Sequence, residues 1–202
     1  MTSGCVEWGV ASRPMRGEVR SGDGYVVATD REGVLVAVVD GLGHGLEASR
    51  AAALAVATLE SHIGETLMSL TRRCHEALIG TRGVVMSLAR FAPRDQTVTW
   101  LGVGNVEGSL LRRKRHGGTL DEPLVPRGGV LGHRLPALMT SVLPVSPLDT
   151  LIFTTDGVAG GFTSTLDGSA QVVADAILDA HGKGSDDALV LVARYLPTEG
   201  AS

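Results

Sequence analysis

The sequence predicts an α+β domain in which helices cover sheets of antiparallel strands. Two observations predict it: helix-like segments lie early and late in the chain, and a block of short strands separated by turns lies between them. The chain has 202 residues, of which 44% are hydrophobic and 20% are charged. This length and composition support one core of substantial size and are too small for two ordinary domains. We therefore expect a single domain over residues 1–202.

The predicted elements follow from local patterns. Residues 34–39 form a short, apolar, β-branched run that indicates a buried strand, and residues 25–28 form an earlier one. Residues 46–62 are rich in Ala, Leu and Glu at helical spacing, and their Ala-rich face is expected to pack closely on a sheet. Two further helices are expected at residues 66–79 and 170–180. The remaining predicted strands are residues 84–91, 97–103, 108–113, 138–143, 150–155 and 188–195.

Charge and composition exclude two classes of partner. The net charge is −4, from 18 Lys and Arg against 22 Asp and Glu, and aromatic residues make up 3% of the chain. Such a chain lacks the basic surplus that drives nucleic-acid binding and the rings that stack on bases. It shows no signal peptide and no stretch near the roughly 18 apolar residues of a membrane helix. We therefore expect no nucleic-acid and no membrane partner. Cys5 and Cys74 provide no disulfide framework, so we expect a cytoplasmic protein.

Acidic residues occur where predicted strands begin or end. Asp40-Gly41 and Asp156-Gly157 each follow an apolar strand, Asp186-Asp187 begins the last strand, and Asp23 precedes the first. Carboxylates brought together in this way raise each other's pKa, and bound cations remove the repulsion. Because these motifs offer oxygen donors, with His44 as their sole imidazole, they favour Mg²⁺ or Mn²⁺ over a structural zinc. Clustered carboxylates with two such ions are a recurring solution for phosphoester hydrolysis.

Each of these motifs also has a simpler structural interpretation. Asp-Gly is common in hairpin turns, and Asp186-Asp187 could belong to a solvated loop. Asp40-Gly41, however, leads into a helix rather than a second strand. The stretch Gly41-x-Gly43-x-Gly45 is similar to a dinucleotide-binding fingerprint, but Leu46 stands where the third glycine is required. A further alternative is a metal-binding scaffold that grips phosphoproteins without catalysis.

Taken together, these motifs resemble those of the metal-dependent PPM (PP2C-type) Ser/Thr protein phosphatases. Asp40-Gly41, Thr155-Asp156-Gly157 and Asp186-Asp187 occur in the family's order, with Gly102-Val103-Gly104-Asn105-Val106 and Gly128-Gly129-Val130-Leu131-Gly132 between them. The stretch 39–45 and the compact length are most similar to the bacterial branch that contains SpoIIE, RsbU and RsbX. Within that branch the chain is most like the RsbX type, the stressosome feedback phosphatase. The match covers about residues 17–195.

The resemblance implies a four-layer α/β/β/α sandwich of two mostly antiparallel sheets, with two divalent cations, Mn²⁺ or Mg²⁺, at one edge. Asp40 would bridge both ions, and the Gly41 carbonyl oxygen would complete one coordination shell. Asp156 and Asp186 would hold the other ion. Asp186 is chosen over Asp187 because the last ligand of the family is the first acid of its pair. Asp23 matches an early acidic position that binds directly or through water.

The resemblance also implies the reaction and the partners. It implies direct hydrolysis of phosphoserine or phosphothreonine on a protein, here a STAS-domain protein of the stressosome, by a chain that acts as a monomer. Larger relatives carry Asp-Gly-His with the His as a proposed general acid, and His44 is the candidate here. Many relatives also place a phosphate-binding Arg near the early motif; Arg13, Arg16 and Arg20 lie nearby without matching that pattern. The basic run 112–116 is expected to form a solvated hairpin tip, or to dock an acidic or phosphorylated partner.

Overall fold

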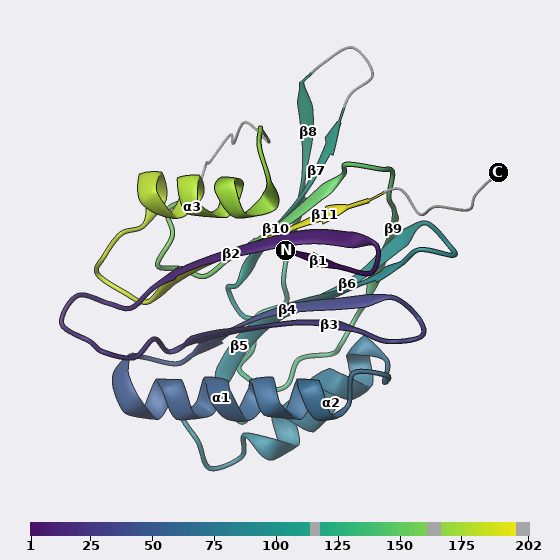
Figure 1. Cartoon of the computed structure of the whole chain (residues 1–202). Coiled ribbons are helices and arrows are strands. Elements are labelled where there is room, and N and C mark those ends of the chain that lie inside the picture. The colour runs from purple at the N-terminus through teal and green to yellow at the C-terminus, as the bar shows by residue number, and fades with distance from the viewer. Residues whose placement is uncertain (114–117, 161–166, 197–202) are drawn as a thin grey trace.

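Two sheets lie face to face between helices in the structure, a computed structural model that describes residues 1–113, 118–160 and 167–196. Figure 1 shows the layers in the order helix, sheet, sheet and helix. Helices α1 (Gly45–Ser61) and α2 (Leu67–Ala77) cover one outer face, and α3 (Ala170–His181) lies on the other. The predicted α/β/β/α sandwich is therefore confirmed.

Every pairing between the named strands is antiparallel. The first sheet has the order β1-β2-β11-β10-β7-β8 and the second has the order β3-β4-β5-β6-β9. The strands of the first sheet are β1 (Thr2–Ser3), β2 (Val6–Arg13), β11 (Ala188–Tyr195), β10 (Thr150–Thr154), β7 (Glu107–Arg113) and β8 (Thr119–Leu124). Those of the second are β3 (Asp23–Thr29), β4 (Val34–Gly41), β5 (Val84–Ala92), β6 (Thr97–Val103) and β9 (Ser141–Pro144). Because β4 pairs antiparallel with both neighbours, the dinucleotide-binding alternative, which needs parallel βαβ units, is wrong.

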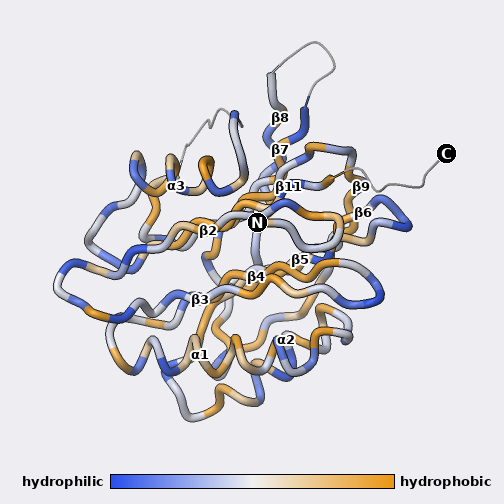
Figure 2. The backbone as a smooth tube through the Cα atoms, in the orientation of Figure 1, coloured by the Kyte–Doolittle hydropathy of each residue, from blue (hydrophilic) through white to orange (hydrophobic). Residues whose placement is uncertain are grey.

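Strand β4 shows why its sequence is apolar without alternation. Val34, Val36 and Val38 face the other sheet and join the core between the sheets. Leu35, Ala37 and Val39 face the helices and join a second core beneath α1 and α2. A strand covered on both faces must be apolar at every position, as Figure 2 shows for this region.

Helix α1 packs closely on its sheet because its inner face consists of small side chains. Ala48, Ala51, Ala52 and Ala55 are buried there. The backbone of α1 comes so near that a Cβ on Gly41 would lie 2.3 Å from the Ala48 carbonyl oxygen. The expectation that the Ala-rich face packs on a sheet is confirmed, and this packing sets how α1 sits against the end of β4.

Four strands differ from the sequence-based expectation. Strands β1 and β2 were not predicted, although β2 pairs with β11 along its whole length. Strand β8 was not predicted because Pro123 and its polar neighbours disfavour a strand; Pro is tolerated there because β8 is an edge strand. Strand β9 begins at Ser141, later than the predicted 138–143.

The basic run 112–116 is only partly described. Arg112 lies within β7 and is not a solvated tip residue: its guanidinium contacts Glu122 at 2.8 Å and Asp149 at 3.3 Å. Arg113 ends the strand, and residues 114–116 lie outside the described part of the chain.

Among the described residues, no helix has the length and apolar character that crossing a bilayer requires.

Enlarging the α1 interface should destabilise the fold. Ala55 is fully buried against the sheet, so Ala55→Leu forces extra volume into a packed layer and should cost about 1–3 kcal/mol of unfolding free energy. Urea unfolding measures this loss. Ala57→Leu is the matched control, because Ala57 is exposed on the same helix. Equal midpoints for the two variants would contradict the close packing of α1.

Candidate metal centre

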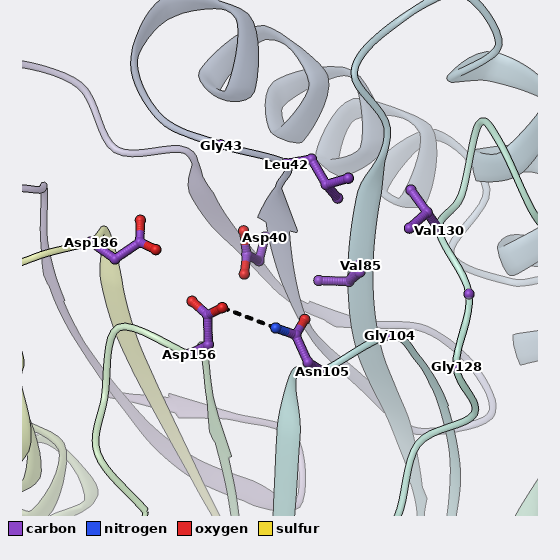
Figure 3. A pocket seen from close by; sticks show the side chains of 11 residues that line it. Asp40, Leu42, Gly43, Val85, Gly104, Asn105, Gly128, Val130, Asp156 and Asp186 are labelled. Atoms are coloured by element: carbon purple, nitrogen blue, oxygen red, sulfur yellow. Dashed lines mark hydrogen bonds between the residues drawn. The ribbon is translucent and has the colours of Figure 1, made fainter.

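A cavity of about 350 Å³ lies at the edge of the sandwich and contains three carboxylates, those of Asp40, Asp156 and Asp186. Figure 3 shows these side chains facing the same space, with Leu42, Val85 and Val130 on its apolar side. The remaining lining residues are Gly43, Gly104, Asn105, Gly128 and Gly129. The lining residues given for this cavity include no Lys, Arg or His, so its ionisable groups are all acidic.

Strand ends bring these acids together from distant parts of the sequence. Asp40 is the penultimate residue of β4, Asp156 follows β10, and Asp186 precedes β11. Strands β10 and β11 are neighbours in one sheet, and β4 lies in the facing sheet. The sequence prediction that these acids meet at one edge of the sandwich agrees with this placement.

Asp23 lies directly opposite Asp40 in the antiparallel pairing of β3 with β4. Its Oδ2 atom accepts a hydrogen bond of 2.8 Å from the Thr155 hydroxyl, beside Asp156. The same Thr155 oxygen accepts the Leu189 N–H at 2.9 Å. Asp23 is absent from the residues that line the main cavity and lines a neighbouring one of about 280 Å³. It thus joins the two sheets behind the three facing carboxylates.

The adjacent acids Asp186 and Asp187 have different environments. Asp187 is buried, and its two oxygens accept backbone N–H groups from Met15 at 2.8 Å and Gly22 at 2.7 Å. Asp186 instead lines the cavity. Asp187 therefore fixes the loop that leads into β3, and Asp186 is the acid of the pair that is available to a ligand.

The structure places the other two predicted site residues away from the cavity lining. Gly41 is buried at the end of β4, where its N–H donates to the Gly22 carbonyl oxygen at 3.0 Å. His44 is exposed at the N-cap of α1, and its Nδ1 lies 2.9 Å from a carboxylate oxygen of Glu18. Neither residue is among those that line the cavity.

Two polar contacts at the site were not assigned from the sequence. Asn105 donates its Nδ2–H to the Asp156 carboxylate at 3.0 Å, and Lys183 donates its Nζ–H to the Asp156 carbonyl oxygen at 2.6 Å. Asn105 belongs to a motif that the sequence singled out, so its position was a usable signal. Lys183 carries no such signal, because its contact depends on how two loops meet.

The electrostatics of the site disfavour charge on its inner acids. Burial, opposed by a hydrogen bond from Thr155 and reinforced by the neighbouring aspartates, raises the pKa of Asp23 from 3.8 to about 7. Burial and then the charge of Asp23 and its neighbours raise the pKa of Asp40 from 3.8 to about 8. Within the described residues, no group of three or more acidic, His or Cys side chains has the spacing needed to hold a metal ion. A hard divalent cation binds carboxylate oxygens and removes the repulsion between them, so the residues of this cavity fit such an ion.

This fold is that of the PP2C class of phosphatases. Residues 30–196 match the family model of stage II sporulation protein E (SpoIIE), and the chain therefore belongs to that family. The predicted membership of the PPM family, in its bacterial SpoIIE branch, is confirmed.

Known relatives agree with this assignment. The phosphoserine phosphatase RsbX of Bacillus subtilis (strain 168) is 31% identical over 85 residues, which is 42% of this chain and 43% of that protein. The aligned region thus spans less than half the length of that relative. A structure from work on the bacterial stressosome as a modular system for secondary messenger signalling is 30% identical with a TM-score of 0.85, covering 94% of this chain and 99% of that one.

Two more distant structures share the fold. RsbX in complex with magnesium is 21% identical with a TM-score of 0.81, over 96% of this chain and 98% of that one. The serine/threonine phosphatase PstP/Ppp of Mycobacterium tuberculosis is 16% identical with a TM-score of 0.75, over 95% of this chain and 99% of that one.

The raised pKa values predict how metal-free stability depends on pH. Both carboxyls hold protons more tightly in the folded chain than in the unfolded one. Their contribution to the stability of the folded chain is therefore complete below about pH 4, and it is lost as the pH rises through about 7 and 8. In EDTA, the melting temperature should fall by at least about 5 °C between pH 5.5 and 8.5. Asp40→Asn should flatten this fall, and saturating Mn²⁺ should abolish it; an identical profile for wild type and variant would refute the electrostatic account.

Proposed function

We propose that this chain is a metal-dependent protein phosphatase that hydrolyses phosphoserine or phosphothreonine on a protein substrate. The observation that carries the proposal is the convergence of Asp40, Asp156 and Asp186 in one cavity of a SpoIIE-family chain. The relative named phosphoserine phosphatase RsbX supports the reaction, and PP2C-class structures with magnesium or two manganese ions support the cofactor.

Asp40, Asp156 and Asp186 are the proposed carboxylate ligands of two divalent cations, with the Gly41 carbonyl oxygen and Asp23 as further contributors. Asp186 is preferred to its neighbour because Asp187 already accepts two backbone N–H groups. Bound there, two such cations would lower the pKa of a shared water and offset charge on the phosphoryl oxygens.

The remaining residues hold this arrangement in place. The Asn105 amide fixes the orientation of the Asp156 carboxylate, and the Thr155 hydroxyl fixes that of Asp23. Lys183 ties the loop that carries Asp156 to the loop that leads to Asp186. Because these contacts orient the acids before substrate binds, less reorganisation is needed in the transition state.

The stressosome is the proposed setting, and a phosphorylated STAS-domain protein is the proposed substrate. The similarity to RsbX and to a protein from a stressosome structure supports this assignment. Monomeric action stays a prediction. The competing non-catalytic scaffold would also bind metal and phosphoprotein, and turnover distinguishes it from an enzyme.

Hydrolysis of a phosphoserine peptide tests the proposal directly. With Mn²⁺ we expect steady release of phosphate, its loss in EDTA, and a fall of at least about 100-fold in kcat for Asp40→Asn, since one proposed ligand of both ions is weakened. Asp95→Asn makes the same chemical change in the exposed turn between β5 and β6 and should retain full activity. Activity that survives both chelation and Asp40→Asn would refute the two-metal mechanism; metal binding without turnover would favour the scaffold.

His44 is the proposed general acid, and its contact with Glu18 offers a way to test that role. His44→Ala should slow turnover by about 10- to 100-fold and leave the Mn²⁺ affinity, measured by calorimetry, nearly unchanged. Glu18→Gln keeps the imidazole and removes the charge of its partner, so it should slow turnover less than His44→Ala does. Loss of Mn²⁺ binding in His44→Ala would assign the residue a structural or ligand role instead.

A further inference from the structure

A guanidinium group lies beside a glycine that lines the acidic cavity, on a loop that the sequence motifs do not include; Arg82 itself is not among the lining residues. Arg82 lies between α2 and β5, and its Nη1 atom is 2.7 Å from the point that a Cβ on Gly43 would occupy. Gly43 lines the cavity. The positive charge therefore lies against the rim of a site whose own ionisable side chains are acidic.

The fold holds this loop in place. The Leu42 N–H donates to the Gly83 carbonyl oxygen at 3.1 Å, which ties the Arg82 loop to the loop after Asp40. The His133 Nε2 atom lies 3.0 Å from the Arg82 carbonyl oxygen on the other side. Gly43 has a φ of +83° and no side chain, so it also leaves the space that the guanidinium uses.

Arg82 has no acidic partner among the residues that the structure describes. Ion pairs with acids involve other arginines of that part of the chain, namely Arg13, Arg50, Arg73, Arg90, Arg112 and Arg194. Two of the arginines near the early motif have other contacts: Arg13 pairs with Asp179, and Arg16 lies against Gly184. Arg82 is thus an exposed cation beside Gly43, without an acidic partner in the described part of the chain.

We propose that Arg82 binds the phosphoryl group of the substrate, a phosphate monoester dianion, as it enters the cavity. The inference rests on the proposed phosphatase function and adds the residue that recognises the charged group. A guanidinium presents a planar set of donors that pairs with two phosphoryl oxygens at once, which an ammonium group does not match. Two bound cations would offset the three carboxylates, and Arg82 adds positive charge on the approach of the dianion from the protein side.

Phosphate binding and turnover, measured separately, test this proposal. The Mn²⁺-loaded chain is titrated with inorganic phosphate by calorimetry, and kcat/KM is measured on p-nitrophenyl phosphate and on a phosphoserine peptide. For Arg82→Ala we expect phosphate affinity and both kcat/KM values to fall on the order of 10- to 100-fold. Arg82→Lys should recover part of the loss. Arg72→Ala removes an exposed guanidinium from α2 and should behave as wild type.

Four results would overturn the inference. The first is an unchanged phosphate affinity in Arg82→Ala, and the second is a loss of kcat/KM confined to peptides with acidic residues beside the phosphoserine. The third is an equal loss of Mn²⁺ affinity in Arg82→Ala. The fourth is the absence of phosphate binding by the Mn²⁺-loaded wild type. The second would assign Arg82 to a peptide carboxylate instead. Phosphate binding that depends on Arg82 in a chain without turnover would uphold the inference and refute the proposed function. Turnover that is unchanged in Arg82→Ala would refute the inference and uphold the proposed function.

Discussion

The burial of Asp23 and Asp40, two carboxyl groups that face each other across β3 and β4, is the constraint on which the rest of the site depends. Both side chains are partly buried, and their pKa values are raised to about 7 and 8. Ordinary core packing would replace such a pair with apolar residues. The chain keeps the pair at the edge of the sandwich, where further acids from the facing sheet complete the oxygen-rich edge that we propose as the cation site.

The surrounding polar groups divide into those that are satisfied by the protein and those left for a ligand. Asp187 is fully engaged by backbone N–H groups, and Thr155 links Asp23 to the backbone of β11. These contacts make the frame rigid. Asp40 and Asp186 face the cavity (Figure 3), although Asp186 Oδ1 also accepts the Asp187 N–H at 2.9 Å. The same short segment can therefore stabilise the fold through one acid and offer a ligand through its neighbour.

The sequence predicted those parts of the fold that depend on local pattern. The apolar run of β4, the helices and the acids at strand ends follow from composition and spacing, and the motifs indicated the family. The sequence did not predict β2, whose partner β11 lies at the other end of the chain. Nor did it predict the pairing of Thr155 with Asp23, because a contact across 132 residues depends on tertiary register. Arg82 escaped notice for the same reason, since Gly43 and Arg82 meet only through loop packing.

The pairing of β2 with β11 has a consequence for how the protein is made. Strand β2 can pair only after β11, the last strand, has been made. Asp187 likewise holds the loop that precedes β3 through contacts that span 172 and 165 residues. Contacts this remote in sequence slow folding, since the chain must close a long loop before it gains their energy. During synthesis the emerging polypeptide therefore lacks a finished site until its final strand leaves the ribosome. The proposed activity therefore requires the whole domain.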